Sequence, residues 1–520
     1  MIMMFSKINY RHFVWLLCIL TGLRIFVGNA AFPFFNNVDE HAHFDTIMKY
    51  AKGDLPSKEN LRFEPESARF IVLYGSPEYF YRAENYTSKE IPLPNWKLGE
   101  AVNVDYLSQE WLDKKNHEVF SPPVYYSFLG FWFHVGKWMG LEGGYQLYWL
   151  RFLNLFIYIS IFWIVYWMLG VFWHDNLYIR TSVLLLVTVF PQDVFYTLNS
   201  DTLSALFCLL SFFFLMEIYF TNKSYLFYFL AGSFTAMAFL TKVSNVPLIT
   251  LVGLILFLRV IKLIRSQQMI QKEIVNLIIF VLSTSIPVFV WFLWNQMTIG
   301  EFTGTAEKMR DLDWTYKPIT EIFNHPIFTL KGFTYFFSSL FKTFWRGELV
   351  WGLREMAAKD SDRLYTYSIL LVIASGFNSI LNKQAYSDRI RFVQILSFIY
   401  IIISVLFLLL LSMIYDFGKC WYPSRENPFF TSGRLMIGMM IPFLILFVDG
   451  IRIFILFIEN LLNWILSFIN KRFSDSKTKI QLSTTKVLIG FILLICFLIS
   501  QYETKSLWMV MQSKYNWFFL

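Results

Sequence analysis

Charged residues and cysteines are scarce in this sequence. Lys, Arg, Asp and Glu together make up 16% of the 520 residues, whereas soluble globular proteins average about a quarter. The four cysteines, at positions 18, 208, 420 and 496, have neither the spacing of metal ligands nor that of a redox pair. The glycine patterns of P-loops and dinucleotide-binding domains are also missing, which argues against nucleotide-driven transport and against a Rossmann-type nucleotide-sugar enzyme.

Apolar and aromatic residues are abundant in this sequence. The sequence is 56% hydrophobic and 20% aromatic, and aromatic belts are typical of proteins that cross a lipid bilayer. Apolar runs of membrane-spanning length recur along the whole chain. We therefore expect an all-α polytopic membrane protein with about 11 transmembrane helices. The expected spans are residues 13–32, 147–172, 177–196, 201–220, 224–241, 246–264, 274–296, 364–381, 391–415, 434–458 and 486–504.

The net charge of +8 is explained by the positive-inside rule and gives no reason to expect a nucleic-acid partner. The basic residues form short clusters between apolar runs, including Arg259, Lys262, Arg265 and Lys272, and later Lys471, Arg472, Lys477 and Lys479. These clusters share one side if the N-terminus is cytoplasmic and residues 122–140 form an amphipathic helix along the membrane surface.

This topology predicts one transmembrane domain over residues 1–504, followed by a short outer tail at 505–520. Two long loops, 33–146 with juxtamembrane helices and 297–363, would then face the outside. Residues 459–470 are expected to form a separate interfacial helix on the cytoplasmic side.

The first outer loop begins with two neighbouring carboxylates, Asp39 and Glu40. Placing a carboxylate at membrane-surface depth costs free energy, so such a residue usually forms an ion pair or has a function. It could act as a general base toward an acceptor hydroxyl, or the pair could bind a divalent cation that neutralises a phosphate. A solvated loop in which Asp39 caps the following helix accounts for the same pattern.

Several short motifs follow in a fixed order and resemble those of one enzyme class, the GT-C glycosyltransferases. The resemblance is to a bacterial branch related to aminoarabinose transferases and protein O-mannosyltransferases. The similar segments are Asp39-Glu40 with His43-Phe44, Ser121 to Tyr126 (compare H-P-P-L-Y-Y), Arg151, Asn199-Ser200-Asp201, Leu240-Thr241-Lys242, Phe344-Trp345-Arg346 and Gly433-Arg434. The sequence departs from the family pattern at Ser121, which replaces His, at Leu435, which replaces Tyr, and at His41, where many relatives have Pro.

The resemblance implies a GT-C-like fold and an inverting glycosyltransferase. Such an enzyme moves a sugar from a polyprenyl-phosphate donor to a glycan, lipid or protein acceptor on the non-cytoplasmic face. Asp39 would be the general base, Glu40 would orient it or contact the acceptor, and Arg434 and Lys242 would bind the donor phosphate. The further residues expected to line the substrates are His43, Pro122, Tyr125, Asn199, Asp201 and Arg346.

The acidic pair leaves room for one cofactor, a divalent cation such as Mg²⁺ or Mn²⁺, for which Asp39 and Glu40 would be the ligands. The family resemblance favours the bacterial inner membrane, with the endoplasmic reticulum as the alternative. Two other functions fit a polytopic protein with long outer loops. A lipid-linked glycan flippase or transporter would show internal repeats and polar residues at the midplane, neither of which is apparent. A surface-polysaccharide polymerase or ligase would rely on loop arginines more than on an early acidic pair.

Overall fold

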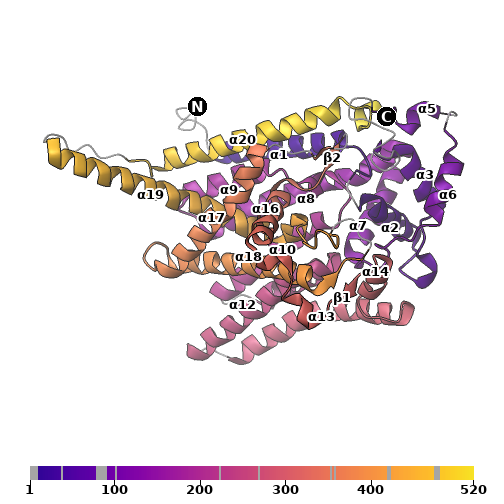
Figure 1. The fold of residues 1–520 in the computed structure, drawn as a ribbon. Coiled ribbons are helices and arrows are strands. Elements are labelled where there is room, and N and C mark those ends of the chain that lie inside the picture. The colour runs from indigo at the N-terminus through magenta and orange to yellow at the C-terminus, as the bar shows by residue number, and fades with distance from the viewer. Residues whose placement is uncertain are drawn as a thin grey trace.

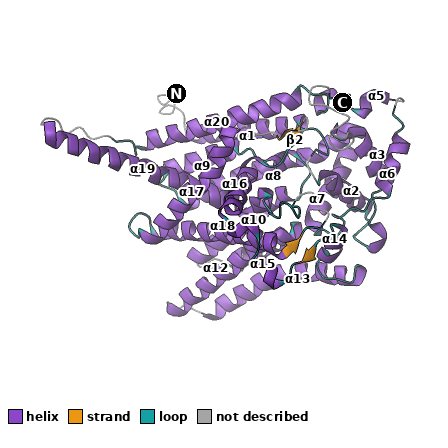
Figure 2. Ribbon diagram, in the orientation of Figure 1, coloured by secondary structure: helices purple, strands orange, loops and turns teal. Residues whose placement is uncertain are grey.

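The structure is a computed structural model of the chain. It describes residues 10–36, 39–77, 91–99, 102–221, 224–266, 270–351, 354–355, 359–418, 423–473 and 481–520. These residues are almost entirely helical (Figures 1 and 2), so the expected all-α polytopic membrane protein is confirmed. Of the expected cytoplasmic cations, Lys477 and Lys479 lie outside the described residues.

Nine helices in the described part are long and apolar enough to cross a membrane. They are α1 (Tyr10–Ala31), α8 (Gly143–Phe172), α10 (Asp201–Phe220), α12 (Val246–Arg265), α13 (Ile270–Thr298), α17 (Lys359–Leu381), α18 (Asp388–Ile414), α19 (Met440–Phe473) and α20 (Thr485–Met511). Their outer surfaces carry large exposed apolar side chains, including Leu23, Phe257, Ile286 and Leu406. Apolar side chains exposed along whole helices are stable only against lipid or another protein.

Two shorter apolar helices, α9 (Leu177–Val189) and α11 (Tyr225–Thr241), occupy the two remaining predicted spans. The 13 residues of α9 extend roughly 20 Å, less than the ~30 Å of a hydrocarbon core. After α9 the chain is no longer α-helical, and residues 190–200, with the short 3₁₀ helix η3 (Asp193–Tyr196), are almost completely buried. Irregular backbone at membrane depth is tolerated where protein surrounds it, and this segment leads directly to the candidate site.

The first long loop lies at one end of the helix bundle, and the second long loop begins at the same end (Figure 1). The first loop contributes η1 (Lys58–Asn60), α2 (Glu40–Lys52), α3 (Pro65–Tyr74), α5 (Asn95–Leu98), α6 (Val104–Leu112) and α7 (Pro123–Trp138). The second contributes α14 (Thr305–Asp311), α15 (Ile319–Ile322), η5 (Pro326–Phe328), α16 (Leu330–Arg346) and the strands β2 (Val350–Trp351) and β3 (Arg354–Glu355). Strand β1 (Thr315–Tyr316) pairs with β4 (Tyr415–Asp416), which ties this loop to the segment after α18.

Helix α7 is the segment expected to lie along the membrane surface. Its 16 residues pack against α2 and α8 at the loop end of the molecule. Gly130 lets the two juxtamembrane helices meet closely, because a Cβ there would lie 3.1 Å from the backbone nitrogen of Ala51. Phe128, Phe131 and Trp138 remain exposed, as suits an amphipathic interfacial helix.

Two predicted boundaries differ in the structure. Residues 459–470 do not form a separate helix; they continue α19, whose 34 residues span roughly 50 Å and project beyond the neighbouring helices (Figure 1). No Gly or Pro follows Gly450 in this stretch, so nothing in the sequence breaks the helix. Helix α20 likewise runs past residue 504 to Met511, and the last residues, including η7 (Trp517–Phe519), pack on α1 and α8.

A buried ion pair fastens the first loop to the bundle. Glu40, at the start of α2, and Arg151, in α8, have fully buried side chains. The guanidinium donates two hydrogen bonds to the carboxylate, at 2.9 and 2.7 Å, and also donates to the carbonyl oxygens of Phe32 and Pro33. The backbone amide of Leu198 donates to the same carboxylate at 2.8 Å. Removing one partner of such a pair typically costs about 3–5 kcal/mol.

The sidedness of the two ends can be tested by cysteine labelling. We expect a membrane-impermeant maleimide to label Lys97→Cys, at the loop end, in intact cells, and to label Arg265→Cys, at the opposite end of α12, only after permeabilisation. Both positions are exposed. A Cys420→Ser background removes the one cysteine outside the described residues, and the other three are buried. The reverse labelling pattern would place the loops in the cytoplasm and contradict the topology.

Candidate functional site

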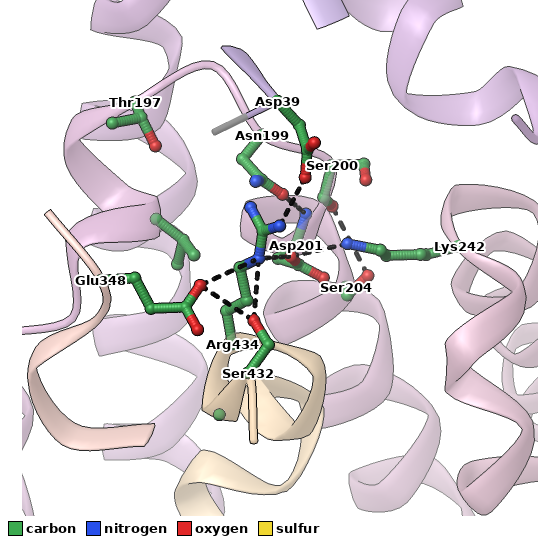
Figure 3. A network of polar contacts seen from close by, with 12 residues as sticks. Asp39, Thr197, Asn199, Ser200, Asp201, Ser204, Lys242, Glu348, Ser432 and Arg434 are labelled. Atoms are coloured by element: carbon green, nitrogen blue, oxygen red, sulfur yellow. Dashed lines mark hydrogen bonds and ion pairs between the residues drawn. The ribbon is translucent and has the colours of Figure 1, made fainter. Parts of the chain in front are cut away.

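Arg434 lies at the centre of a cluster of charged side chains at the loop end of the bundle (Figure 3). One guanidinium nitrogen, Nη2, donates to Oδ2 of Asp39 at 2.5 Å. Its Nε lies 4.0 Å from the carboxylate of Asp201 and 3.8 Å from that of Glu348. The side chain of Arg434 is 12% exposed, so these contacts form in a mostly dehydrated environment where charge interactions are strong.

A close packing contact places Arg434 at this point. Arg434 is the second residue of the 3₁₀ helix η6 (Gly433–Met439), which leads into α19. A Cβ at Gly433 would lie 2.1 Å from the backbone nitrogen of Phe344, so only glycine allows η6 to pack this tightly on α16. The hydroxyl of Ser432 accepts from Arg434 Nε at 3.2 Å and donates to Glu348 at 3.0 Å, which holds both charged side chains in position.

Lys242 and Asp201 form the second ion pair of the cluster. Lys242 follows the last residue of α11, and its ammonium donates to Oδ2 of Asp201 at 2.7 Å. Asp201 is the first residue of α10, where its backbone amide donates to the side chain of Asn199 at 3.0 Å. The structure therefore brings together the two cations predicted to bind phosphate, because both reach the same carboxylate.

A cavity of about 330 Å³ opens beside Lys242. Loop residues contribute much of its polar lining: His117, Glu118, Ser121, Thr303 and Lys308. The helices contribute apolar side chains, namely Val246 from α12, Phe407 and Leu411 from α18, and Leu435 from η6. Polar groups and an apolar wall thus meet in one cavity, and Pro122, one of the predicted lining residues, is part of it.

His117, Glu118 and Lys308 belong to this site, although the family resemblance assigns a role to none of them. His117 Nε2 lies 3.5 Å from Oδ1 of Asp39, and Lys308 Nζ lies 2.5 Å from Oε1 of Glu118. The position of His117 and Glu118 just before the Ser121-Pro122 motif was the available signal for that pair. Lys308 comes from a polar stretch of the second loop with no motif, so only the fold could bring it here.

The charges around Asp39 determine its protonation. Burial alone would raise the pKa of this carboxyl, but the Arg434 guanidinium and, next, His117 outweigh burial and hold the pKa well below its usual range. Asp39 is therefore a carboxylate at neutral pH. Burial raises the pKa of Glu348, against the opposing effect of Arg434, which reduces the excess of negative charge around the two cations.

The other predicted residues lie in three different environments. Glu40 is enclosed by its hydrogen bonds to Arg151 and to backbone amides, so its position favours a structural role that orients the loop carrying Asp39. His43 and Tyr125 are buried behind the site, where His43 contacts the hydroxyl of Tyr126. Arg346 is not brought into the cluster; it pairs with Asp362 at 2.8 Å and lines a separate cavity of about 270 Å³.

The donor set fits a bound metal poorly. Within the described residues, no group of three or more His, Cys, Asp or Glu side chains is arranged to hold a metal ion. Asp39 faces Arg434, whereas both oxygens of Glu40 accept hydrogen bonds from Arg151. The two carboxylates therefore do not converge on a common point, as a shared cation would require.

Asp193 is a buried carboxyl in the turn after α9. One oxygen accepts from the backbone amide of Glu348 at 2.6 Å, and the other has no hydrogen-bond partner among the described residues. A Cβ at Gly347 would lie 1.9 Å from this carboxyl, and Gly347 has φ of 78°, so glycine is required on both counts.

Comparison with known proteins gives a family without an activity. No curated protein matches this sequence. The family described as predicted membrane protein (DUF2142) matches residues 23–419, which is more than half of the chain and includes Asp39, Asp201 and Lys242 but not Arg434. The chain therefore belongs to the DUF2142 family of predicted membrane proteins.

Proposed function

We propose that this protein is an inverting glycosyltransferase of the GT-C type that uses a polyprenyl-phosphate sugar as donor. One observation carries the proposal: Asp39, ionised and held on Arg434, contacts His117, and His117 lines one cavity together with Lys242 and apolar helix side chains. A base, phosphate-binding cations and an apolar surface are the three features that transfer from a lipid-phosphate sugar requires.

The mixed lining of the cavity supports a lipid-linked donor. Lys242 and Lys308 line the cavity and offer charge-assisted hydrogen bonds to a phosphate. Arg434 adds a third cation, because it shares the carboxylate of Asp201 with Lys242 and directly precedes Leu435 of the lining. Val246, Phe407 and Leu411 lie on bundle helices and provide a surface for the first isoprene units of the carrier. A water-soluble nucleotide sugar would have no use for this apolar wall, which is why we favour a polyprenyl-phosphate donor.

The reaction is a single displacement at the anomeric carbon. An acceptor hydroxyl oxygen attacks that carbon from the face opposite the phosphate, and its proton passes to the carboxylate of Asp39. The bond between the anomeric carbon and the phosphate oxygen breaks, and its electron pair leaves on the lipid phosphate. Arg434 and Lys242 stabilise the charge that develops there. One displacement inverts the configuration of the anomeric carbon.

Donor binding would also activate the base. In the structure Asp39 is a weak base, because its ion pair with Arg434 lowers its pKa. A phosphate that takes over the Arg434 guanidinium removes much of this effect, and the pKa of Asp39 then rises toward its ordinary value. The carboxylate accepts a proton more readily once the donor is in place. We place the reaction at the non-cytoplasmic face of a bacterial inner membrane.

Asp39→Asn should abolish transfer without loss of folded protein. The amide keeps the shape of the side chain but cannot take the acceptor proton, so we expect a loss of about 10²–10⁴-fold in rate. Purified protein would be assayed with a panel of polyprenyl-phosphate sugars and a mixed glycan and lipid acceptor extract, with and without a chelator. Asp54→Asn, an exposed carboxylate in the same loop, serves as control. Wild-type-like transfer by Asp39→Asn would refute the role of Asp39 as base.

Arg434→Lys and Arg434→Ala should weaken donor binding by about 10- to 100-fold, because each removes the planar donor groups suited to a phosphate. The lysine variant keeps the positive charge opposite Asp39, so it controls for a loss of binding that is caused by misfolding. Equilibrium binding of a polyprenyl-phosphate sugar measures the effect, with the exposed Arg310→Ala on α14 as the matched control. Unchanged donor affinity in both Arg434 variants would remove this residue from the phosphate site.

A further inference from the structure

A second cavity lies next to the candidate site, on the other side of His117. Its volume is about 310 Å³, and His41, Phe63, Trp111, Lys114 and Lys115 are among its lining residues. That volume is at the lower end of the range for small-molecule sites. No residue of this cavity other than His117 lines the cavity beside Lys242.

His117 connects the two cavities through Asp39. Its ring lines both of them, and its Nε2 lies 3.5 Å from Oδ1 of Asp39. The opposite oxygen of that carboxylate, Oδ2, is occupied by Arg434. A molecule bound in the second cavity would therefore approach the base from the His117 side, while the phosphate-binding cations lie on the Arg434 side.

The floor of the second cavity is aromatic. The rings of His41 and Phe63 are stacked, with centroids 5.8 Å apart and planes inclined by 15°. Trp111 meets both rings edge-on, at 5.2 Å from each. Burial lowers the pKa of His41 to about 3, so this ring is neutral and presents an uncharged face. Phe63 and Trp111 are themselves buried beneath the floor, whereas His41 is partly exposed, so the His41 ring is the flat surface that a sugar ring contacts.

The rim of the cavity carries one uncompensated positive charge. Lys115 pairs with Asp311 at 3.0 Å, and the neighbouring Arg62 pairs with Asp113 at 3.1 Å. Lys114 has no carboxylate partner within the described residues; its ammonium lies 4.2 Å from the centroid of the Trp111 ring. An exposed ammonium above an aromatic surface offers an anion a partner while the ring below contacts apolar atoms.

We infer that this cavity binds the acceptor, and that the acceptor is a sugar carrying an anionic group, either a carboxylate or a phosphate. The inference rests on the proposed glycosyltransferase function, whose acceptor the sequence leaves open. The sugar ring lies on the aromatic floor, its anionic group faces Lys114, and its hydroxyl reaches Asp39 past His117. This arrangement selects acidic glycans over neutral ones of the same size.

Isothermal titration calorimetry of the purified full-length protein tests the inference with three probes. Tetragalacturonate carries carboxylates, mannose 6-phosphate carries a phosphate, and maltotetraose is neutral. We expect at least one anionic probe to bind about tenfold more tightly than maltotetraose, and Lys114→Gln to remove about tenfold of that affinity. Lys97→Gln, an exposed lysine elsewhere in the same loop, should bind like wild type.

Asp39→Asn separates this inference from the proposed reaction. The variant should still bind the anionic probe more tightly than maltotetraose, because Lys114 is unchanged, whereas its transfer activity should be lost. The inference is overturned if neither anionic probe binds more tightly than maltotetraose, or if Lys114→Gln binds like wild type. Transfer by Asp39→Asn would instead overturn the reaction and leave the binding result intact. Elution volume and thermal unfolding report whether each variant is folded.

Discussion

The arrangement of the site depends on the buried ion pair between Glu40 and Arg151. Arg151 is anchored in α8, and through Glu40 it holds the chain that enters the first long loop, while the amide of Leu198 ties the buried turn after α9 to the same carboxylate. The preceding residue, Asp39, is thereby fixed beside Arg434, which comes from a helix almost 400 residues later in the chain. Two neighbouring carboxylates thus have different surroundings: one is enclosed, and the other is 21% exposed and contacts His117.

Several carboxylates in the site compete for the same two cations. Arg434 is within about 4 Å of three carboxylates, those of Asp39, Asp201 and Glu348. Because burial makes ionisation of Glu348 less favourable, the cations Arg434 and Lys242 are balanced mainly by Asp39 and Asp201. Each cation therefore has a carboxylate partner that an incoming phosphate can replace. Such an arrangement keeps the site stable when empty and makes it responsive to an anionic ligand.

The two long loops complete the site by contributing groups from both sides of the cavity. The second loop supplies Lys308, which pairs with Glu118 of the first loop, and Asp311, which pairs with Lys115. Gly304, with φ of 70°, lies against Phe120, where a Cβ would approach within 2.7 Å. The loops are therefore packed together over the bundle, and the cavities on either side of His117 are formed between them.

Much of the architecture followed from the sequence alone. Apolar run length predicts the spans because a helix must be about 20 apolar residues long to cross a bilayer. Because charged residues are scarce in this sequence, those that lie next to a span are candidates for a functional role. The motif positions also identified Asp39, Lys242, Asp201 and Arg434 as candidates, and the structure brings these four together. Helix ends were less certain, as α19 and α20 illustrate, because helices continue wherever no breaker intervenes.

Tertiary structure decided which of the candidate charges are enclosed and which remain open. Nothing in the pattern Asp39-Glu40 distinguishes the two residues; the difference arises because α8 places Arg151 against one and η6 places Arg434 against the other. The place of Lys308 likewise could not be predicted from the sequence, since polar loop residues carry no periodicity that predicts their partners. The sequence alone determined that the chain folds as helices in a membrane, because that depends on local hydrophobicity. Only the fold determined the site, because a charge's surroundings depend on residues distant in sequence.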